Sequence, residues 1–449
     1  MSNVVTTVQS WRLVMAAAAL AWTAAGAQEA PAVQRVTDAL VSEALAANLG
    51  LDQRTATVDQ QLAKLDQVRA EYLPQIDMYL RYSEANGGRT IEVPALDLEF
   101  RFLREREQES YLRLTQPIYD ARLAAEKRGA AHLYDASRHG LEAYRLRLAR
   151  DVRQAYYRWL TARTSIGVLE ATAALAAENV RVNESLYRNG KVTRDLTLSA
   201  EAEHLEIAQQ ILRARAAEDL ARRYLNLLLN APLEREPEAV DVGDADLPRL
   251  AAGMPPTRGA ALESLAVGRR AELRELDSGI AAAGESERAA RAAFKPQLAF
   301  AVDAGTQGEE WSYSDEESYV LASFVVRFNL FNGGGDRAAI REARAKGTEL
   351  TAGRALAEQQ IRIEVQEAIT DLEVAEASLE TARRRVEAAE AAHAIVAKKR
   401  DLGQVSPAEY LDAQRALTEA RLNGNVTRFE ALGALAQVEY AIGGVEQTP

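Results

Sequence analysis

The chain has 449 residues, with 54 Lys and Arg against 66 Asp and Glu, so its formal net charge is −12. It contains no cysteine, which excludes disulfide frameworks, zinc–thiolate and iron–sulfur sites, and a lipid attached through cysteine. The acidic balance argues against a nucleic-acid partner, because such binding needs a basic face. Apolar residues make up 47% of the chain, and the many alanines among them favour long, closely packed helices.

The N-terminal segment has the pattern of a secretory signal peptide. Arg12 precedes a short apolar run, and Ala25-Gly26-Ala27 supplies the small residues of a cleavage site, which we place after Ala27. The apolar run is shorter than the roughly 20 residues that a membrane-spanning helix requires. We therefore expect residues 1–27 to be a signal peptide and the mature protein to leave the cytoplasm.

The rest of the sequence contains two copies of one unit. Pro74 corresponds to Pro296 (296 − 74 = 222), and Gly190 corresponds to Gly403 (403 − 190 = 213). Between these anchors, Ile118-Tyr119-Asp120 matches Leu330-Phe331-Asn332 at an offset of 212 residues. Matches in the same order indicate an internal repeat. The predicted domains are the signal peptide (1–27), repeat 1 (28–230), a proline-rich connector or equatorial region (231–256), repeat 2 (257–443) and a tail (444–449).

Each copy contains a long heptad stripe of apolar residues. The stripe runs from Leu148 to Val180 in repeat 1 and from Ile361 to Val396 in repeat 2, in alternating steps of four and three residues. This spacing predicts coiled-coil packing. We expect helices over about 121–188 and 334–401, each about 100 Å long at 1.5 Å per residue.

A turn signal ends each long helix. Gly190 and Gly403 suit the left-handed conformation that closes a helix, and Thr193 and Ser406 are placed to cap the helix that follows. Return helices are predicted over about 194–229 and 407–441. Because the return helices are shorter, another helix must supply the missing length, and 36–72 and 259–294 are the candidates.

Four short runs alternate apolar with more polar residues, which is typical of β-strands. Three of them begin near Ile76, Leu298 and Val320, and a weaker one includes Leu112 and Leu114. Pro74 and Pro296 break the incoming helix where a strand begins. The loops 84–109 and 305–317 join the strands within each copy.

Strands of about ten residues have the length that crosses a bilayer at a tilt. Four strands cannot close a barrel, because the smallest single-chain barrels use eight, and open edges are not tolerated in lipid. The chain is therefore expected to give four strands to a shared barrel, which three chains would complete with 3 × 4 = 12 strands. The alternative is a soluble four-stranded sheet with helices, which leaves the two long helices without a partner surface.

These features together resemble the TolC-like outer membrane factor family. The resemblance rests on the repeat and on several segments: Leu73-Pro74-Gln75, Lys295-Pro296-Gln297, Gln116 to Asp120, Asn329 to Gly334, Tyr187 to Gly190, Asp401 to Gly403 and Tyr410 to Gln414. It implies a homotrimer that is mainly α with β: a 12-stranded transmembrane β-barrel continued by a long periplasmic coiled-coil barrel. The implied location is the outer membrane of a Gram-negative bacterium, surrounded by outer-membrane lipid and with no lipid anchor.

The resemblance implies a passive exit duct of a tripartite efflux pump or a type I secretion system. A periplasmic adaptor (membrane fusion) protein would recruit the duct, and an inner-membrane pump would supply energy indirectly. The exported substrate is not readable from the sequence. A soluble periplasmic coiled-coil scaffold or adaptor is the alternative function.

The resemblance also implies an acidic ring that narrows the periplasmic entrance. By motif, its residues are Glu409 and Asp412, which lie three apart on one helix and so share a face. Repeat 1 has Leu196 and Ser199 at these positions, so one hairpin per chain would carry the ring. The alternative is that both acids are ordinary solvated residues.

Two further sets of residues are candidates at the ends of the long helices. Arg194 and Asp195 are predicted tip contacts that hold a closed state. The turns are predicted adaptor-docking sites, with helix capping as the alternative role: Gly190, Lys191, Val192, Thr193, Gly403, Gln404, Val405 and Ser406.

No catalytic residue, metal site or cofactor is predicted. The glycines of Gly333-Gly334-Gly335 lack the Gly-Lys-Ser/Thr ending of a phosphate-binding loop, so a tight elbow between strand and helix is expected. The four histidines are scattered, and His393 lies in the heptad stripe, where packing is the expected role.

Overall fold

The computed structural model describes residues 31–86, 90–93, 98–101, 105–243, 246–251, 259–310 and 314–444. The predicted signal peptide lies outside the described residues. The chain divides into two compact units, and each combines parts of both repeats. The first unit contains Met1–Ala46, Leu148–Pro256 and Thr370–Gln437, and the second contains Ala47–Arg147, Thr257–Ile369 and Val438–Pro449. The predicted repeat boundaries therefore describe sequence similarity, and the units in space cut across them.

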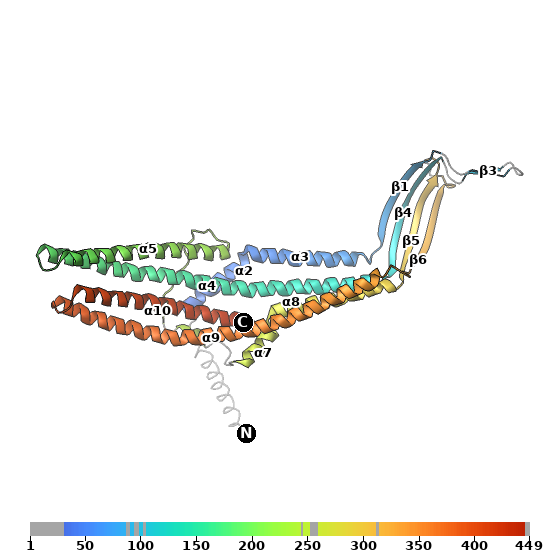
Figure 1. Cartoon of the computed structure of the whole chain (residues 1–449). Helices are drawn as coiled ribbons and strands as arrows, with labels where there is room; N and C mark the ends of the chain where they lie inside the picture. The colour runs from blue at the N-terminus through green and yellow to red at the C-terminus, as the bar shows by residue number, and fades with distance from the viewer. Residues whose placement is uncertain are drawn as a thin grey trace, which may run out of the picture. The chain divides into compact units, whose positions relative to one another are not determined.

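Helices make up most of the chain (Figure 1). They are α2 (Ala32–Ala47), α3 (Leu49–Ala70), α4 (Ala121–Arg188), α5 (Arg194–Leu229), α6 (Asp246–Ala251), α7 (Ala260–Arg269), α8 (Ala271–Arg291), α9 (Gly335–Asp401) and α10 (Pro407–Ala441). Among the described residues, no helix combines the length and the hydropathy needed to cross a bilayer.

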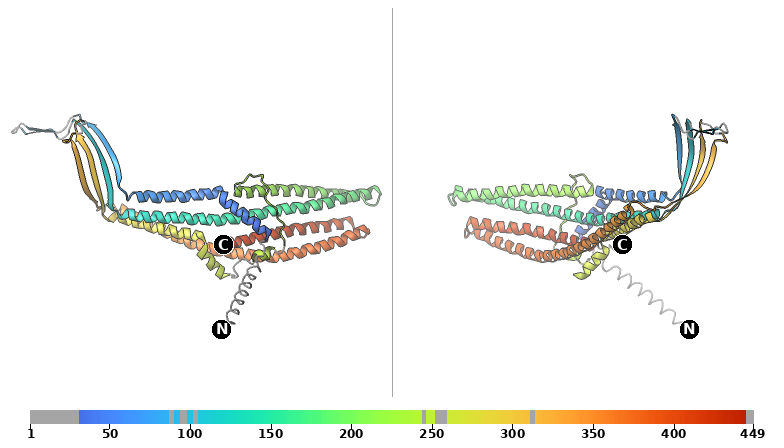
Figure 2. Two further views of the ribbon diagram at one scale, coloured as in Figure 1. Left: turned by 180° about the vertical axis from the view of Figure 1, so that it is seen from behind. Right: turned by 45° about the vertical axis from the view of Figure 1, so that its right-hand side comes forward.

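The two longest helices agree with the sequence analysis within one residue at each end. Helix α4 has 68 residues and α9 has 67, and each is followed by a return helix, α5 or α10. We call α4 with α5 hairpin 1, and α9 with α10 hairpin 2. In the first unit the two helices of each hairpin lie side by side in both views of Figure 2. No residue of either heptad stripe is exposed; Val152 and Trp159 in α4 and Val365 in α9 are fully buried. The coiled-coil pattern therefore identified the packed faces correctly.

The helix expected before each strand is interrupted at one residue. Asn48 separates α2 from α3, and Arg270 separates α7 from α8; both have extended backbone angles. They occupy the same place in the two repeats, because 270 − 48 = 222. The Asn48 side chain accepts a hydrogen bond from the backbone N–H of Leu51 at 3.1 Å, which caps α3. The expectation of one continuous helix was wrong here: the Asn48 side chain caps the new helix, whereas Arg270 breaks the helix without a side-chain capping bond.

The strands form one antiparallel sheet in the order β1-β4-β5-β6 (Figure 1). Their bounds are β1 (Gln75–Glu84), β4 (Arg106–Tyr119), β5 (Gln297–Gly308) and β6 (Ser318–Arg327). Pro74 lies directly before β1 and Pro296 directly before β5. The fourth predicted strand had the weakest pattern, yet β4 is the longest, with 14 residues. It pairs with strands on both sides, and this pairing outweighs its weak alternation.

The loop predicted over 84–109 contains additional structure. Residues Thr90–Val93 (β2) and Leu98–Arg101 (β3) pair as a separate two-stranded antiparallel sheet. The flanking strands also extend into the predicted loop, so β4 begins at Arg106 rather than after residue 109. Short strands without a long alternating pattern could not be recognised from the sequence.

The four-stranded sheet has one apolar and one polar face. Residues that pair across antiparallel strands share a face, and the register places even-numbered residues together on each of the four strands. In the single chain the apolar face is largely exposed: Met78 is 67% exposed, Val320 77% and Phe324 75%. Other members of this face are Ile76, Leu80, Leu112, Leu114, Leu298, Phe300, Val302 and Val326.

Candidate functional site

The two hairpins end in turns with the same backbone geometry. Gly190 and Gly403 adopt φ values of +67° and +68°. The N–H of Gly190 donates to the carbonyl of Tyr187 at 2.9 Å, and the N–H of Lys191 donates to the carbonyl of Leu186 at 2.9 Å. The turn of hairpin 2 has the same pair of bonds, from Gly403 and Gln404 to Arg400 and Lys399. This pattern is a Schellman motif, which requires a left-handed residue where glycine stands.

The capping residues after these turns differ. In hairpin 2 the Ser406 Oγ accepts a hydrogen bond from the backbone N–H of Glu409 at 3.2 Å, as predicted for a helix cap. In hairpin 1, Thr193 lies at the N-cap position with an extended backbone, but its side chain makes no capping bond. The capping prediction is therefore correct for Ser406 and wrong for the side chain of Thr193. The middle of each turn exposes only part of Val192 and Val405, while Lys191 and Gln404 are exposed.

The two acids predicted to form the entrance ring both lie in the first two turns of α10. Glu409 and Asp412 are exposed, while their neighbours Tyr410 and Leu411 are buried. Neither carboxylate forms an ion pair with another described residue, so both charges are available to solvent. Their placement on one exposed face is what the ring requires, and the ring itself stays a prediction.

The predicted tip contacts, Arg194 and Asp195, are exposed in the first turn of α5. Neither forms an ion pair with another residue in the part of the chain that the structure describes. Their role in a closed state therefore stays a prediction.

A cluster of three side chains packs α9 against α10 near the turn of hairpin 2. The ring of His393 lies 5.5 Å from the ring of Tyr410, and the guanidinium of Arg400 lies 3.9 Å from the centre of the same tyrosine ring. Burial and the charges of Arg400 and Arg421 lower the pKa of His393 from its usual value. The expectation that His393 packs inside the coiled coil is confirmed, and its neutral form is favoured.

Polar groups also connect the two hairpins within the first unit. Arg415 of α10 pairs with Glu203 of α5, with its Nε 2.7 Å from a carboxylate oxygen, and the Glu203 side chain is only 7% exposed. The hydroxyls of Thr172 in α4 and Thr418 in α10 lie 3.1 Å apart. Between these contacts Gln414 is 2% exposed, and neither of its side-chain polar atoms has a partner among the described residues. These residues join two segments more than 200 positions apart, and the sequence analysis missed them.

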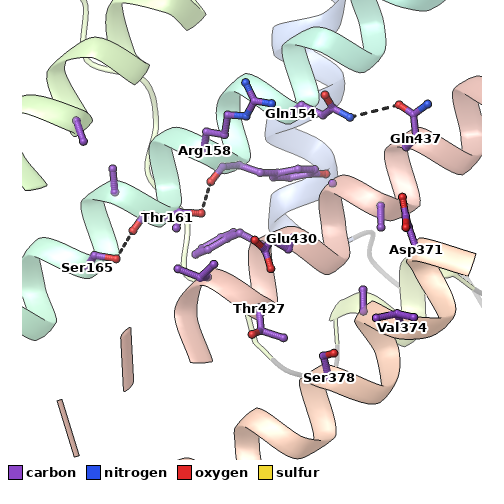
Figure 3. A pocket seen from close by; sticks show the side chains of 18 of the residues that line it. Gln154, Arg158, Thr161, Ser165, Asp371, Val374, Ser378, Thr427, Glu430 and Gln437 are labelled. Atoms are coloured by element: carbon purple, nitrogen blue, oxygen red, sulfur yellow. Dashed lines mark hydrogen bonds between the residues drawn. The ribbon is translucent and has the colours of Figure 1, made fainter. Parts of the chain in front are cut away.

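A cavity of about 890 Å³ lies among these helices (Figure 3). Its lining comes from α4, α9 and α10 with two alanines of α5, and small side chains such as Ala162, Ala375 and Gly433 prevail. A hydrogen bond of 3.5 Å from Gln154 to Gln437 crosses between α4 and α10 at the cavity. The small residues leave the space open.

The polar face of the sheet carries charged groups that neutralise one another. Arg113 of β4 lies opposite Asp303 of β5, and the two form a bidentate ion pair with distances of 2.6 and 2.7 Å. The guanidinium of Arg113 also lies over the stacked rings of Tyr79 and Tyr111. Gly305 lies directly opposite Tyr111, and a Cβ at Gly305 would come within 2.4 Å of the Tyr111 Cβ. This face suits water, as the interior of a membrane barrel does.

The family model for outer membrane efflux proteins matches residues 40–231 and 262–444, which together are most of the chain. The chain belongs to the outer membrane efflux protein family. The break between the matched ranges covers residues 232–261 and overlaps the predicted connector. The family and the fold are those of channel proteins.

Individual relatives with identities of 27% and 24% also support this family. The alkaline protease secretion protein AprF of Pseudomonas aeruginosa is 27% identical over 280 residues, which cover 61% of this chain and 56% of AprF. The pyoverdine export outer membrane protein OpmQ of Pseudomonas putida is 24% identical over 334 residues, covering 72% of this chain and 67% of OpmQ. The alignment with AprF thus spans little more than half of that relative.

The fold agrees with a solved channel over nearly the whole chain. The outer membrane channel CmeC of Campylobacter jejuni superposes with a TM-score of 0.80 at 18% identity, covering 92% of this chain and 87% of CmeC. The predicted fold class, mainly helical with four barrel strands per chain, is confirmed. The predicted location in the outer membrane is confirmed as well, because the chain belongs to the outer membrane efflux protein family.

Proposed function

We propose that this outer membrane efflux protein is the exit duct of a tripartite efflux pump or a type I secretion system. The observation that carries the proposal is the four-stranded sheet, with an exposed apolar face for lipid and a charged, polar face for a water-filled lumen. Transport through such a duct is passive diffusion, and no catalysis by this chain is part of the proposal. The proposal includes both kinds of system, because AprF is named for protease secretion and OpmQ for pyoverdine export.

The working form is a homotrimer. The sheet ends in β1 on one side and β6 on the other, and neither has an outer neighbour among the described residues. Such edges are not tolerated in lipid, so other chains must cover them. Three chains supply 3 × 4 = 12 strands, which agrees with the trimer that the resemblance implies.

The gate is the periplasmic end of the helical hairpins. Outward movement of the turns at Gly190 and Gly403 opens the entrance, and Glu409 and Asp412 form its acidic rings. A ring of three carboxylates favours cations over anions. Arg194 and Asp195 contact neighbouring hairpins when the entrance is closed.

The partners are a periplasmic adaptor protein and, through it, an inner-membrane pump. The adaptor docks at the exposed turns, where Val192 and Val405 are half-buried apolar residues between polar neighbours. The repeat gives each chain two such turns with the same backbone geometry, so a trimer offers six docking points, three of each kind.

Bilayer recordings of the purified full-length protein test the duct. Wild type is expected to form trimers and to conduct. Val302→Pro should abolish conductance, because proline in central β5 removes a ladder hydrogen bond, whereas Val302→Ile should conduct like wild type. A soluble monomer without conductance would refute the duct and would favour a periplasmic scaffold or adaptor.

A second experiment separates docking from channel formation. Val405→Asp should reduce export in cells while the purified protein conducts as before, because a charge opposes burial under an adaptor. Ala377→Asp, at an exposed position of α9 away from the turn, is the matched control and should leave export unchanged. Equal export by both variants would show that the turn of hairpin 2 is not part of the docking surface.

A further inference from the structure

The end of the sheet remote from the helices carries polar residues on the face that is apolar elsewhere. Strand β4 leads into α4 at Tyr119, so the remote end is the one where β4 begins and β5 ends (Figure 1). There the even-numbered positions of these two central strands are Gln108 and Ser110 in β4, and Thr306 and Gly308 in β5. The hydroxyls of Ser110 and Thr306 lie 3.2 Å apart and form a hydrogen bond. One row of this polar patch is therefore satisfied within the chain.

The next row contains a buried amide without a partner. The Gln108 side chain is 0% exposed, and neither its Oε1 nor its Nε2 has a hydrogen-bond partner among the described residues. Buried amides are normally hydrogen-bonded, and one without a protein partner points to a bound ion, water or ligand. Strand β4 already has β1 on one side and β5 on the other, so no strand of another copy can pair with it there.

The Glu317 carboxylate lies beside this amide. The Glu317 carbonyl accepts a hydrogen bond from the N–H of Gln307 at 3.0 Å, which holds its backbone against β5. Its side chain folds over Gly308: a Cβ on that glycine would lie 2.5 Å from Glu317 Oε1 and 2.9 Å from Oε2. Glycine at 308 therefore makes room for the carboxylate. Because Gly308 pairs directly with Gln108, the carboxylate and the amide share one face of the sheet.

The charge of Glu317 is not balanced by a basic side chain. Its Oε2 is buried without a hydrogen-bond partner, and no basic residue pairs with it in the part of the chain that the structure describes. Buried charges in proteins are paired with an opposite charge or coordinate a metal ion. Gln108 is neutral and cannot balance the carboxylate, but its carbonyl oxygen can bind the same cation.

We propose that Glu317 and Gln108 bind a calcium ion between them. The donor atoms are all oxygen, which hard cations prefer, and Ca²⁺ accepts an irregular shell completed by water. Residues directly opposite in a sheet have Cβ atoms about 4.5–5.5 Å apart, so the two side chains can both reach one ion. Glu317 is only partly buried, which leaves an entry path. A single carboxylate gives an affinity in the range of about 10⁻⁴–10⁻³ M, as in extracellular calcium modules.

The ion fastens the start of β6 to the centre of the sheet. Glu317 directly precedes Ser318, the first residue of β6, and Gln108 lies in β4 on the far side of β5. The sequence analysis predicted no metal site, because the two donors lie 317 − 108 = 209 positions apart and only one of them is acidic. The site needs the sheet of one chain and no transport activity, so it can be tested separately from the duct.

Terbium luminescence of the purified full-length protein in detergent tests the site. Tb³⁺ replaces Ca²⁺ at oxygen ligands and emits when a nearby tyrosine is excited. Tyr82 lies directly opposite Gln108 on β1 and is placed to sensitise it. Wild type should show a saturable signal that millimolar Ca²⁺ displaces. The measurement is made in the Glu409→Gln with Asp412→Asn background, so that these exposed acids do not contribute.

Glu317→Gln should weaken Tb³⁺ binding by about tenfold or more, because it removes the only charge among the donors. Glu316→Gln is the matched control, since its side chain is exposed, and it should leave binding unchanged. Gly308→Ala keeps both donors but places a Cβ where the carboxylate lies, and it should also weaken binding. Circular dichroism checks that each variant is folded.

Gln108→Glu is the decisive variant, because misfolding cannot explain a gain. A second carboxylate should raise the affinity for Tb³⁺ and Ca²⁺ by about tenfold, since affinity rises with ligand charge. Equal binding by the Glu317→Gln and Glu316→Gln variants would overturn the site. Binding that Gln108→Glu leaves unchanged or weakens would overturn it as well. Neither result would bear on the duct, which is judged by conductance.

Discussion

The ends of the two hairpins share a backbone and differ in their side chains. Both turns place a glycine at φ near +67° and make the same two hydrogen bonds. Beyond the turn, hairpin 2 has a serine cap, two exposed carboxylates and the packed His393–Tyr410 pair, whereas hairpin 1 has Leu196 and Ser199 at the positions of the carboxylates. The repeat thus preserves the backbone geometry of the two ends, and only hairpin 2 carries the two predicted ring carboxylates.

The two repeats share the backbone geometry of the turn but not the charges that follow it. Backbone bonds of a Schellman turn depend on little except glycine, so both copies keep them. In the proposed entrance a carboxylate acts through its charge, and rings from one hairpin per chain would supply three carboxylates each. Two sets of rings would add like-charge repulsion in a narrow space.

The largest effect is expected from removing the ion pair that joins the two hairpins. Arg415→Met leaves the carboxylate of Glu203 buried without its partner, which should lower the free energy of unfolding by about 2–3 kcal/mol. Thermal unfolding of the trimer, followed by circular dichroism, measures the loss. Arg421→Met is the matched control, because its pair with Glu390 is exposed and worth at most about 1 kcal/mol. Equal losses would show that the contact between hairpins is no stronger than a surface ion pair.

The next effect concerns the charges that distinguish the ends. Glu409→Gln with Asp412→Asn should weaken block of the channel by multivalent cations by about tenfold, as the loss of about 1.4 kcal/mol would. Block is measured in bilayers as a function of cation concentration. Glu419→Gln, which removes an exposed acid farther along α10, should leave the block unchanged. Unaltered block in the double variant would show that both acids are ordinary solvated residues.

The two capping residues should differ by a smaller amount in how much stability their removal costs. Ser406→Ala removes the acceptor for the N–H of Glu409 and should destabilise hairpin 2 by about 1 kcal/mol. Thr193→Ala should cost less, since the Thr193 side chain makes no capping bond. Hydrogen exchange of the first-turn amides in α5 and α10 measures both. A larger increase in exchange from Thr193→Ala in α5 than from Ser406→Ala in α10 would contradict the assigned difference.

The smallest effect is a pH dependence confined to hairpin 2. The pKa of His393 is lowered in the folded state, so the unfolded state binds the proton more readily. Its contribution is therefore present above the unfolded pKa of about 6.5 and is lost as the pH falls below that value. When the pH is lowered from neutral to mildly acidic, the His393→Phe variant should lose less stability than the wild type loses. Thermal unfolding at each pH measures the two losses. His132→Phe is the control, and an identical slope in the His393 variant would contradict the assignment.

Long-period patterns predicted the helices well, because a heptad stripe repeated over many turns has few alternative explanations. The bounds of α4, α5 and α10 and the packing of His393 followed from it. The short breaks at Asn48 and Arg270 and the β2–β3 pair did not, since each depends on a few local bonds. The Arg415–Glu203 pair was also missed, because an ion pair between distant segments has no periodic signature in a chain rich in both charges.

The repeat, the long helices, the four strands and the alternation of their two faces could all be predicted from the amino-acid sequence. These properties depend on local periodicity, which a chain expresses whatever its neighbours are. Only the tertiary structure decided that β4 lies between β1 and β5 and is the longest strand, that buried polar groups join the two hairpins, and that β6 ends at Arg327. These outcomes depend on which segments become neighbours, since a strand extends only where another strand satisfies its backbone and a buried charge is stable only beside its partner.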